Sequence, residues 1–153
     1  MSIRLLRTLT KYYDLVELAT KDQAIDVPSE LDFVPGPGDD LESMIWVLTY
    51  AMMLRHHENL QAPHKALYKR KVLDAFYSCL SYSALAEKRQ ILMLRGIISF
   101  EDDPERWFSD PAQSKWFRGA MTLVAGQNLS LISINSITFD AFDKLCDDFL
   151  TSE

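Results

Sequence analysis

Glycine, basic residues and long apolar runs are scarce in this chain of 153 residues, and each scarcity excludes a class of function. Five glycines leave little material for a Gly-rich phosphate-binding loop. The 16 Lys and Arg residues are outnumbered by 22 Asp and Glu residues, and the net charge of −6 argues against nucleic acid as a partner. The longest apolar stretch, Met44 to Leu54, is far shorter than the ~18–20 residues that a membrane-spanning helix needs, so no membrane association is expected.

Cysteine is also rare, with Cys79 and Cys146 far apart and without a C-x-x-C spacing. We interpret them as two reduced, buried thiols of an intracellular protein, with a disulfide between them as the alternative. The first residues contain no apolar segment of the signal-peptide kind, because Arg7, Lys11 and Asp14 interrupt it. We therefore expect a cytoplasmic or nuclear protein.

Apolar residues make up 48% of the chain, which excludes intrinsic disorder and predicts a single domain over 1–153. Prolines and glycines at 21–38 indicate an internal linker. Elsewhere apolar residues recur at three- and four-residue steps, the spacing of one helix face. The predicted fold class is all-α, with about six helices at 2–20, 39–54, 64–78, 84–94, 110–125 and 138–150. The segment 129–137 is either a short strand or a loop.

Local signals predict where several of these helices begin and end. Ser2, Asp110 and Thr138 have side chains that can accept a hydrogen bond from the first turn of a helix, and Pro111 suits a first helical position. Asp39 or Asp40 is expected to cap the next helix in the same way. The residues at 126–128, Gly-Gln-Asn, are expected to stop the fifth helix.

The helix from Met44 to Leu54 is apolar on nearly every side. A helix without a polar face is normally buried all round. We therefore expect it to be the central post of the domain, with Trp46 in the core and the other helices packed around it.

The segment Asp39-Asp40-Leu41-Glu42-Ser43, followed by a helix with Trp46 and Tyr50, resembles the central F helix of a protein-kinase C-lobe. The D-D-L-E-S form resembles that helix in casein-kinase-1-like and fungal-type protein kinases. Residues 1–6 resemble the fungal-type motif that closes the activation segment, and 138–150 resemble that family's last helix. The resemblance implies that Asp40 is a structural anchor, because the matching carboxylate in kinases accepts backbone amides of the catalytic loop.

The catalytic parts of a kinase have no counterpart in the sequence. It contains no H-R-D-x-x-x-x-N, no D-F-G and no V-A-I-K-like lysine. Arg4 stands where the closing motif of kinases has Glu, which leaves the usual Glu–Arg pair without its acid. Phosphoryl transfer depends on parts that position phosphates and metal. We therefore expect no enzymatic activity, no nucleotide and no other cofactor.

Other candidate clusters have simpler interpretations. His56, His57 and His64 are expected to be solvated loop residues rather than a metal site. The basic stripe formed by Lys65, Lys69, Arg70 and Lys71 is interpreted as a solvated helix face, with an acidic partner as the alternative.

The aromatic and acidic clusters are weighed in the same way. Trp107 and Phe108 are the aromatic pair most expected to be exposed, and with Lys65 and Lys69 they are the candidate partner-binding residues. Trp116-Phe117 is expected in the core, and the acidic pairs at 101–103 and 147–148 at the surface.

The leading functional hypothesis is a non-catalytic protein–protein interaction module that binds itself or another protein. In kinases the F helix is covered by the catalytic loop and the helix before it, so the apolar helix here needs other cover. Either the first helix and residues 31–35 fold back over it, or another molecule covers it, and we expect a homodimer or a hetero-complex built on this face. Two alternatives stay open: a fragment of a split kinase that needs a partner for its nucleotide site, and an unrelated helical regulatory adaptor.

Overall fold

Helices make up all the regular structure in the described part of the chain. The computed structural model describes residues 1–21, 27, 33–73, 81–98, 108, 110–129 and 136–151, with the backbone alone at 71, 72 and 95–98. The elements are α1 (Ile3–Lys21), α2 (Pro37–Asn59), α3 (Ala62–Tyr68), a π-helical turn η1 (Lys69–Leu73), α5 (Tyr82–Ile98), α6 (Pro111–Leu129) and α7 (Phe139–Leu150). The predicted all-α class with about six helices is confirmed.

Three helices begin where their capping side chains predict. Ser2 Oγ accepts a hydrogen bond from the Leu5 amide at 3.1 Å, and Thr138 Oγ1 accepts one from the Ala141 amide at 3.2 Å. Asp110 Oδ1 accepts one from the Ala112 amide at 2.8 Å, with Pro111 as the first helical residue. Each bond satisfies an amide that the first turn of a helix leaves without an intrahelical acceptor.

Helix α2 begins earlier than the sequence predicts. Gly36 is its N-cap and Pro37 its first residue, so neither Asp39 nor Asp40 is the cap. Asp39 lies in the first turn instead, where its carboxylate accepts the Gly36 amide at 2.9 Å. The helix also continues to Asn59, which places His56 and His57 in the helix rather than in a loop. Pro37 and Gly38, predicted as linker, therefore belong to α2, and most of the remaining linker lies outside the described residues.

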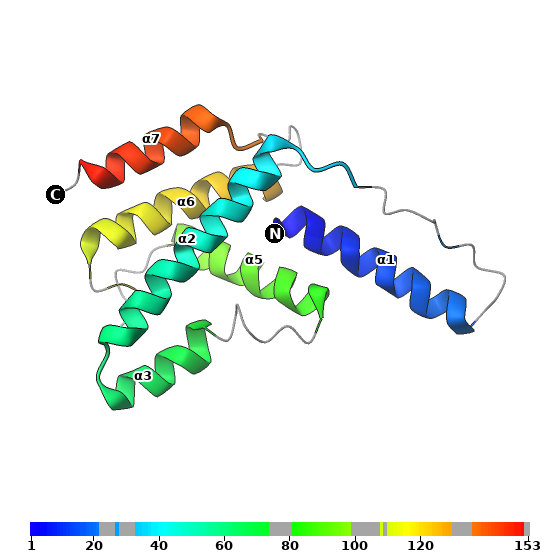
Figure 1. Cartoon of the computed structure of the whole chain (residues 1–153), viewed down its shortest axis with the longest axis horizontal. Helices are drawn as coiled ribbons and strands as arrows, with labels where there is room; N and C mark the ends of the chain where they lie inside the picture. Colours follow the sequence, from blue (N-terminus) through cyan, green and yellow to red (C-terminus); the bar gives the residue numbers. More distant parts are fainter. Residues whose placement is uncertain are drawn as a thin grey trace.

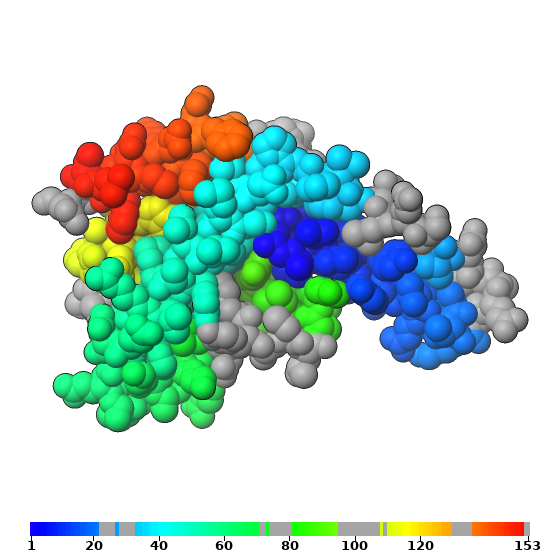
Figure 2. Space-filling view, viewed as in Figure 1, coloured from blue at the N-terminus to red at the C-terminus, as the bar shows by residue number. Residues whose placement is uncertain are grey.

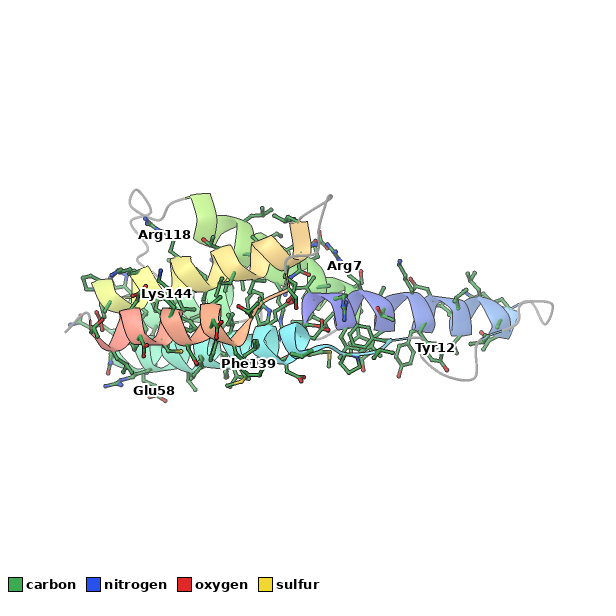
Figure 3. The ribbon with its side chains drawn as sticks, turned by 90° about the horizontal axis from the view of Figure 1, so that it is seen from above. Arg7, Tyr12, Glu58, Arg118, Phe139 and Lys144 are labelled. Atoms are coloured by element: carbon green, nitrogen blue, oxygen red, sulfur yellow. The ribbon has the colours of Figure 1, made fainter. Side chains whose placement is uncertain are left out.

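The helices pack as a series of neighbours with α2 laid across it. Helix α1 contacts α5, α5 contacts α6, and α6 contacts α7. Helix α2 crosses in front of α6 and α5 and contacts α6, η1 and α3 (Figure 1). The second half of α1, where Tyr12 lies, extends beyond the other helices (Figure 3).

The main core lies between α2 and α6, with contributions from the neighbouring elements. Trp46 of α2 and Phe117 of α6 are among its largest fully buried side chains. Trp116, which sequence also places in the core, is buried beside them. The remaining members include Ile45, Met53, Met93, Ala120, Met121 and Val124.

One side of α2 is left open, so the prediction of a helix buried all round is wrong. Met44, Val47 and Leu48 are 50%, 65% and 40% exposed. The reason is positional: α2 lies on the outside of the bundle, and its described neighbours pack on one side only. An apolar pattern on every side therefore does not make this helix a central post.

Two further helix boundaries differ from the prediction. The expected helix at 64–78 is divided into α3 and η1, and residues 74–80 lie outside the described part. Helix α6 continues through Gly126, Gln127 and Asn128, the expected stop, and ends at Leu129. The question of a strand or a loop at 130–135 also lies outside the described residues. Within the part of the chain that the structure describes, no helix has the length and apolar character of a membrane span.

Candidate interaction site

The exposed side of α2 carries a continuous apolar stripe. Met44, Val47, Leu48 and Ala51 are all exposed, and their spacing places them on one face of the helix. Ile45, Trp46, Thr49 and Met53 occupy the opposite, buried face. In the space-filling view α2 forms a ridge across the visible face of the molecule, and no other described segment covers it (Figure 2). Exposed apolar surface of this kind on a single structural element marks an interaction site more often than isolated apolar residues do.

Charged residues lie at both ends of this stripe. Asp40 precedes Met44 by one helical turn, and Arg55 follows Ala51 by one turn. Both side chains are exposed. The face therefore has an apolar centre with an acid near its N-terminal end and a base near its C-terminal end, the arrangement of an apolar patch with a polar rim.

The buried side of α2 is fixed by Glu42. This side chain is fully buried. Each of its two carboxylate oxygens accepts two hydrogen bonds. Oε1 accepts the Ile3 amide at 2.7 Å and Trp46 Nε1 at 3.0 Å. Oε2 accepts Gln127 Nε2 at 2.8 Å and Asn128 Nδ2 at 3.0 Å. Four donors around one carboxylate offset the cost of removing its charge from water.

The Glu42 cluster (Glu42 with Ile3, Trp46, Gln127 and Asn128) joins three helices at one point. The Ile3 amide belongs to the first turn of α1, where a negative charge is favourable for the helix dipole. Gln127 and Asn128 belong to the last turn of α6. Gln127 Oε1 in turn accepts the Ile137 amide at 3.0 Å, which adds the segment before α7. The cluster therefore sets the position of α2, and with it the position of the exposed stripe.

Asp40 does not take the anchoring place that the kinase resemblance implies. Its side chain is exposed, whereas Glu42, two residues further on, is the buried carboxylate. The sequence contains a signal that Glu42, rather than Asp40, is the buried acid. Glu42 lies one helical turn before Trp46, on the same helix face as Thr49 and Met53, and so on the side that the core must cover.

Arg4 binds the start of α2 instead of a kinase-type acid. Its guanidinium forms an ion pair with Asp39, whose side chain is buried, and donates to the Val34 carbonyl at 3.2 Å. It also lies over the Phe33 ring, 5.0 Å from the centroid. The Arg4 contacts and the Glu42 cluster together hold the first turn of α1 against the first turns of α2.

The candidate partner-binding residues do not form one surface in the described structure. Phe108 is only 3% exposed and packs against Phe117, with ring centroids 5.4 Å apart, so the expectation of an exposed Phe108 is wrong. Trp107 lies outside the described residues. Lys65 is half-buried on α3 and Lys69 is exposed on η1, whereas Phe108 belongs to the buried core. The open face of α2 is therefore the better candidate.

The histidines divide between the core and the surface, and one of the two cysteines lies in the described part of the chain. His56 is buried and packs on Tyr68 at 4.9 Å between ring centroids, which corrects its expected place in a solvated loop. His64 is exposed on α3. Burial raises the pKa of the Cys146 thiol, a free thiol on α7, and Cys79 lies outside the described residues. Among the residues that the structure describes, no group of three His, Cys, Asp or Glu side chains could hold a metal ion.

Comparison with protein-family models, with curated proteins and with solved structures finds no match to this chain. The kinase resemblance thus stays a prediction from the residues that carry it.

Proposed function

We propose that this chain is a non-catalytic protein–protein interaction module that docks a second protein chain on the exposed face of α2. The observation that supports the proposal is the stripe of Met44, Val47, Leu48 and Ala51, exposed on a helix whose other side is firmly held. Removing apolar side chains of this size from water stabilises a complex by roughly 25 cal/mol per Å² before the costs of association are subtracted.

The rigidity of the face favours its use in binding. Helix α2 is held on its buried face by the Glu42 cluster and by the packing of Ile45, Trp46 and Met53 in the core. A face that is already ordered loses little conformational entropy when a partner docks, and more of the apolar contribution then appears as affinity. Methionine, which lies at one end of the stripe, is also enriched at interfaces because its flexible side chain adapts to a partner.

The proposal includes the absence of nucleotide chemistry. It is supported by the missing catalytic-loop, metal-binding and nucleotide-binding motifs in the sequence. A direct measurement is the melting temperature of the chain with and without millimolar MgATP. We expect no change, and a rise of several degrees would contradict this part of the proposal.

Site-specific photo-crosslinking tests the docking face itself. A photoreactive amino acid at Val47, in the centre of the stripe, is expected to give a covalent adduct with another protein chain in cells that express this protein. The matched control is the same amino acid at Ile91, which is 45% exposed on α5. Adducts at position 47 but not at 91 would support the proposal. Adducts at neither position, or equally at both, would contradict it.

A further inference from the structure

We infer that the chain that docks on α2 is a second copy of this same protein, packed antiparallel about a two-fold axis, an inference that rests on the proposed function. The stripe and its charged ends extend from Asp40 to Arg55, a length of about 22 Å along the helix. With 100° per residue, Asp40, Met44, Val47, Leu48, Ala51 and Arg55 all lie within about 50° of one line along α2. They therefore form a single edge that can lie against another helix.

This edge is complementary to itself when one copy is reversed. An axis between Val47 and Leu48 places Val47 of each copy opposite Leu48 of the other. Residues at equal distances on either side of that point are then paired across the interface, as a two-fold symmetric contact requires. Met44 falls opposite Ala51, so the longest side chain of the stripe meets the smallest. A large side chain opposite a small one is how close-packed helices fill the space between them.

The charges at the ends select the antiparallel direction. The same axis places Asp40 opposite Arg55 of the second copy, and by symmetry the pair occurs twice. A parallel arrangement would place Asp40 near Asp40 and Arg55 near Arg55, and such like-charge contacts are unfavourable. Glu58 continues the edge beyond Arg55 and falls opposite Pro37, which carries no charge. The end charges therefore match a second copy without any further residue being required.

The position of α2 leaves room for this partner. Figure 1 shows the helix in front of α5 and α6, and the view from above shows it along one side of the molecule, with Glu58 labelled near its end (Figure 3). A second copy related by the axis approaches α2 from that open side. Each protomer carries a net charge of −6, so the two copies repel at long range and the contact depends on the matched edge.

Charge exchange tests the inference on the full chain. Asp40→Arg and Arg55→Asp each place like charges together twice in the proposed dimer. We expect either variant alone to raise the dimer dissociation constant, measured by sedimentation velocity, at least about tenfold. The double variant Asp40→Arg/Arg55→Asp is expected to recover most of the wild-type affinity. An equimolar mixture of the two single variants is expected to associate as a heterodimer, because each introduced charge then faces its opposite.

Matched controls separate this effect from a general change of charge. Asp140→Arg on α7 and Arg118→Asp on α6 make the same substitutions at exposed positions outside α2. We expect both to associate as the wild type does. Far-ultraviolet circular dichroism checks that every variant is folded, which is expected because all four positions are exposed.

The outcomes distinguish this inference from the proposed function. A wild-type chain that stays monomeric to about 100 µM, but crosslinks a different protein from position 47, overturns the second copy and leaves the proposed function standing. A dimer that Asp40→Arg weakens, but that neither the double variant nor the mixture restores, overturns the antiparallel register. A monomer without any crosslink at position 47 overturns both.

Discussion

Glu42 brings a carboxylate into the core and has enough donors to keep it there. Removing an ionised group from water is costly unless charge or hydrogen bonds compensate. Each oxygen of Glu42 accepts two hydrogen bonds, from one backbone amide and three side chains. Glu42 therefore stabilises the fold by accepting these four hydrogen bonds, and the four donors lose an acceptor if the residue is replaced.

Glu42→Gln keeps the size of the side chain and turns one acceptor into a donor. We expect the free energy of unfolding to fall by about 2–4 kcal/mol, because at least two of the four donors are then buried without an acceptor. Urea denaturation measures the change. Glu87→Gln, the same substitution at an exposed position on α5, is the matched control and is expected to change stability by less than about 0.5 kcal/mol. A loss for Glu42→Gln as small as that of the control would show that the cluster does not hold α2.

Tyr68 gives the molecule a pH-dependent stability in the alkaline range. Burial raises the pKa of its phenol above the ordinary value of 10.0. In the unfolded chain the phenol ionises near pH 10, whereas in the folded chain it stays neutral. The folded state is therefore not affected by this group below pH 10, and it loses stability as the pH rises above that value.

The Tyr68→Phe variant has no phenol to ionise. We expect its stability to fall less steeply than that of the wild type between pH 9 and pH 11, by up to about 1.4 kcal/mol per pH unit above pH 10. Urea midpoints at several pH values measure the two slopes. Equal slopes for the wild type and Tyr68→Phe would contradict the role of burial.

At the scale of the helix, the sequence predicts what depends on nearby residues. The caps at Ser2, Asp110 and Thr138 form hydrogen bonds to residues two or three positions away, so the local pattern contains both partners. The end of α6 is different. Gly126-Gln127-Asn128 is typical of a helix stop, but Gln127 and Asn128 bind Glu42, which is 85 and 86 residues away in the sequence. No local pattern contains that partner, and the helix extends through the predicted stop to reach it.

The candidate site, too, could be predicted from the sequence only in part. The apolar character of α2 and the need for cover were visible in the sequence, because they depend only on which side chains the helix carries. Which side of α2 is exposed depends on where α6, η1 and α3 pack, and that is a property of the tertiary structure. The prediction of an exposed Phe108 is wrong for the same reason, because the residues around it in the sequence do not show that Phe117 lies beside it.

Helix α2 approaches the segment before α7 so closely that only glycine fits at Gly38. A Cβ atom there would lie 3.2 Å from the Ile137 amide nitrogen and 2.5 Å from Gln127 Oε1. We expect Gly38→Ala to lower the free energy of unfolding by about 1–3 kcal/mol, because the backbone or the Glu42 cluster must shift. Gly126→Ala on α6 is the opposite case, with nothing within 4 Å of the added carbon.

For Gly126→Ala we expect a gain of about 0.5–1 kcal/mol, the usual difference between alanine and glycine inside a helix. Thermal or urea unfolding of the two variants beside the wild type measures both effects. The essential result is that Gly38→Ala lowers the free energy of unfolding whereas Gly126→Ala raises it. Two variants that are equally stable would contradict the close approach of α2 and the α7 segment.

At the scale of the whole molecule, self-association and folding stability must be linked if the α2 face binds a second copy. A partner that binds only the folded chain raises the melting temperature by mass action, and here the partner's concentration is the protein's own. For a chain of this length we expect a rise of about 2 °C for each tenfold increase in protein concentration within the range where dimers form.

Val47→Glu removes this dependence without altering the fold. Val47 is 65% exposed, so the substitution is expected to change the stability of the isolated chain by less than about 0.5 kcal/mol. In the dimer, however, each introduced carboxylate would be buried against an apolar side chain of the other copy, which is unfavourable without a partner charge. Scanning calorimetry at three concentrations is expected to give a rising melting temperature for the wild type and for the control Ile91→Glu on α5, and a constant one for Val47→Glu. A wild-type melting temperature that does not depend on concentration would contradict self-association, and a rise that persists in Val47→Glu would place the contact on another face of the molecule.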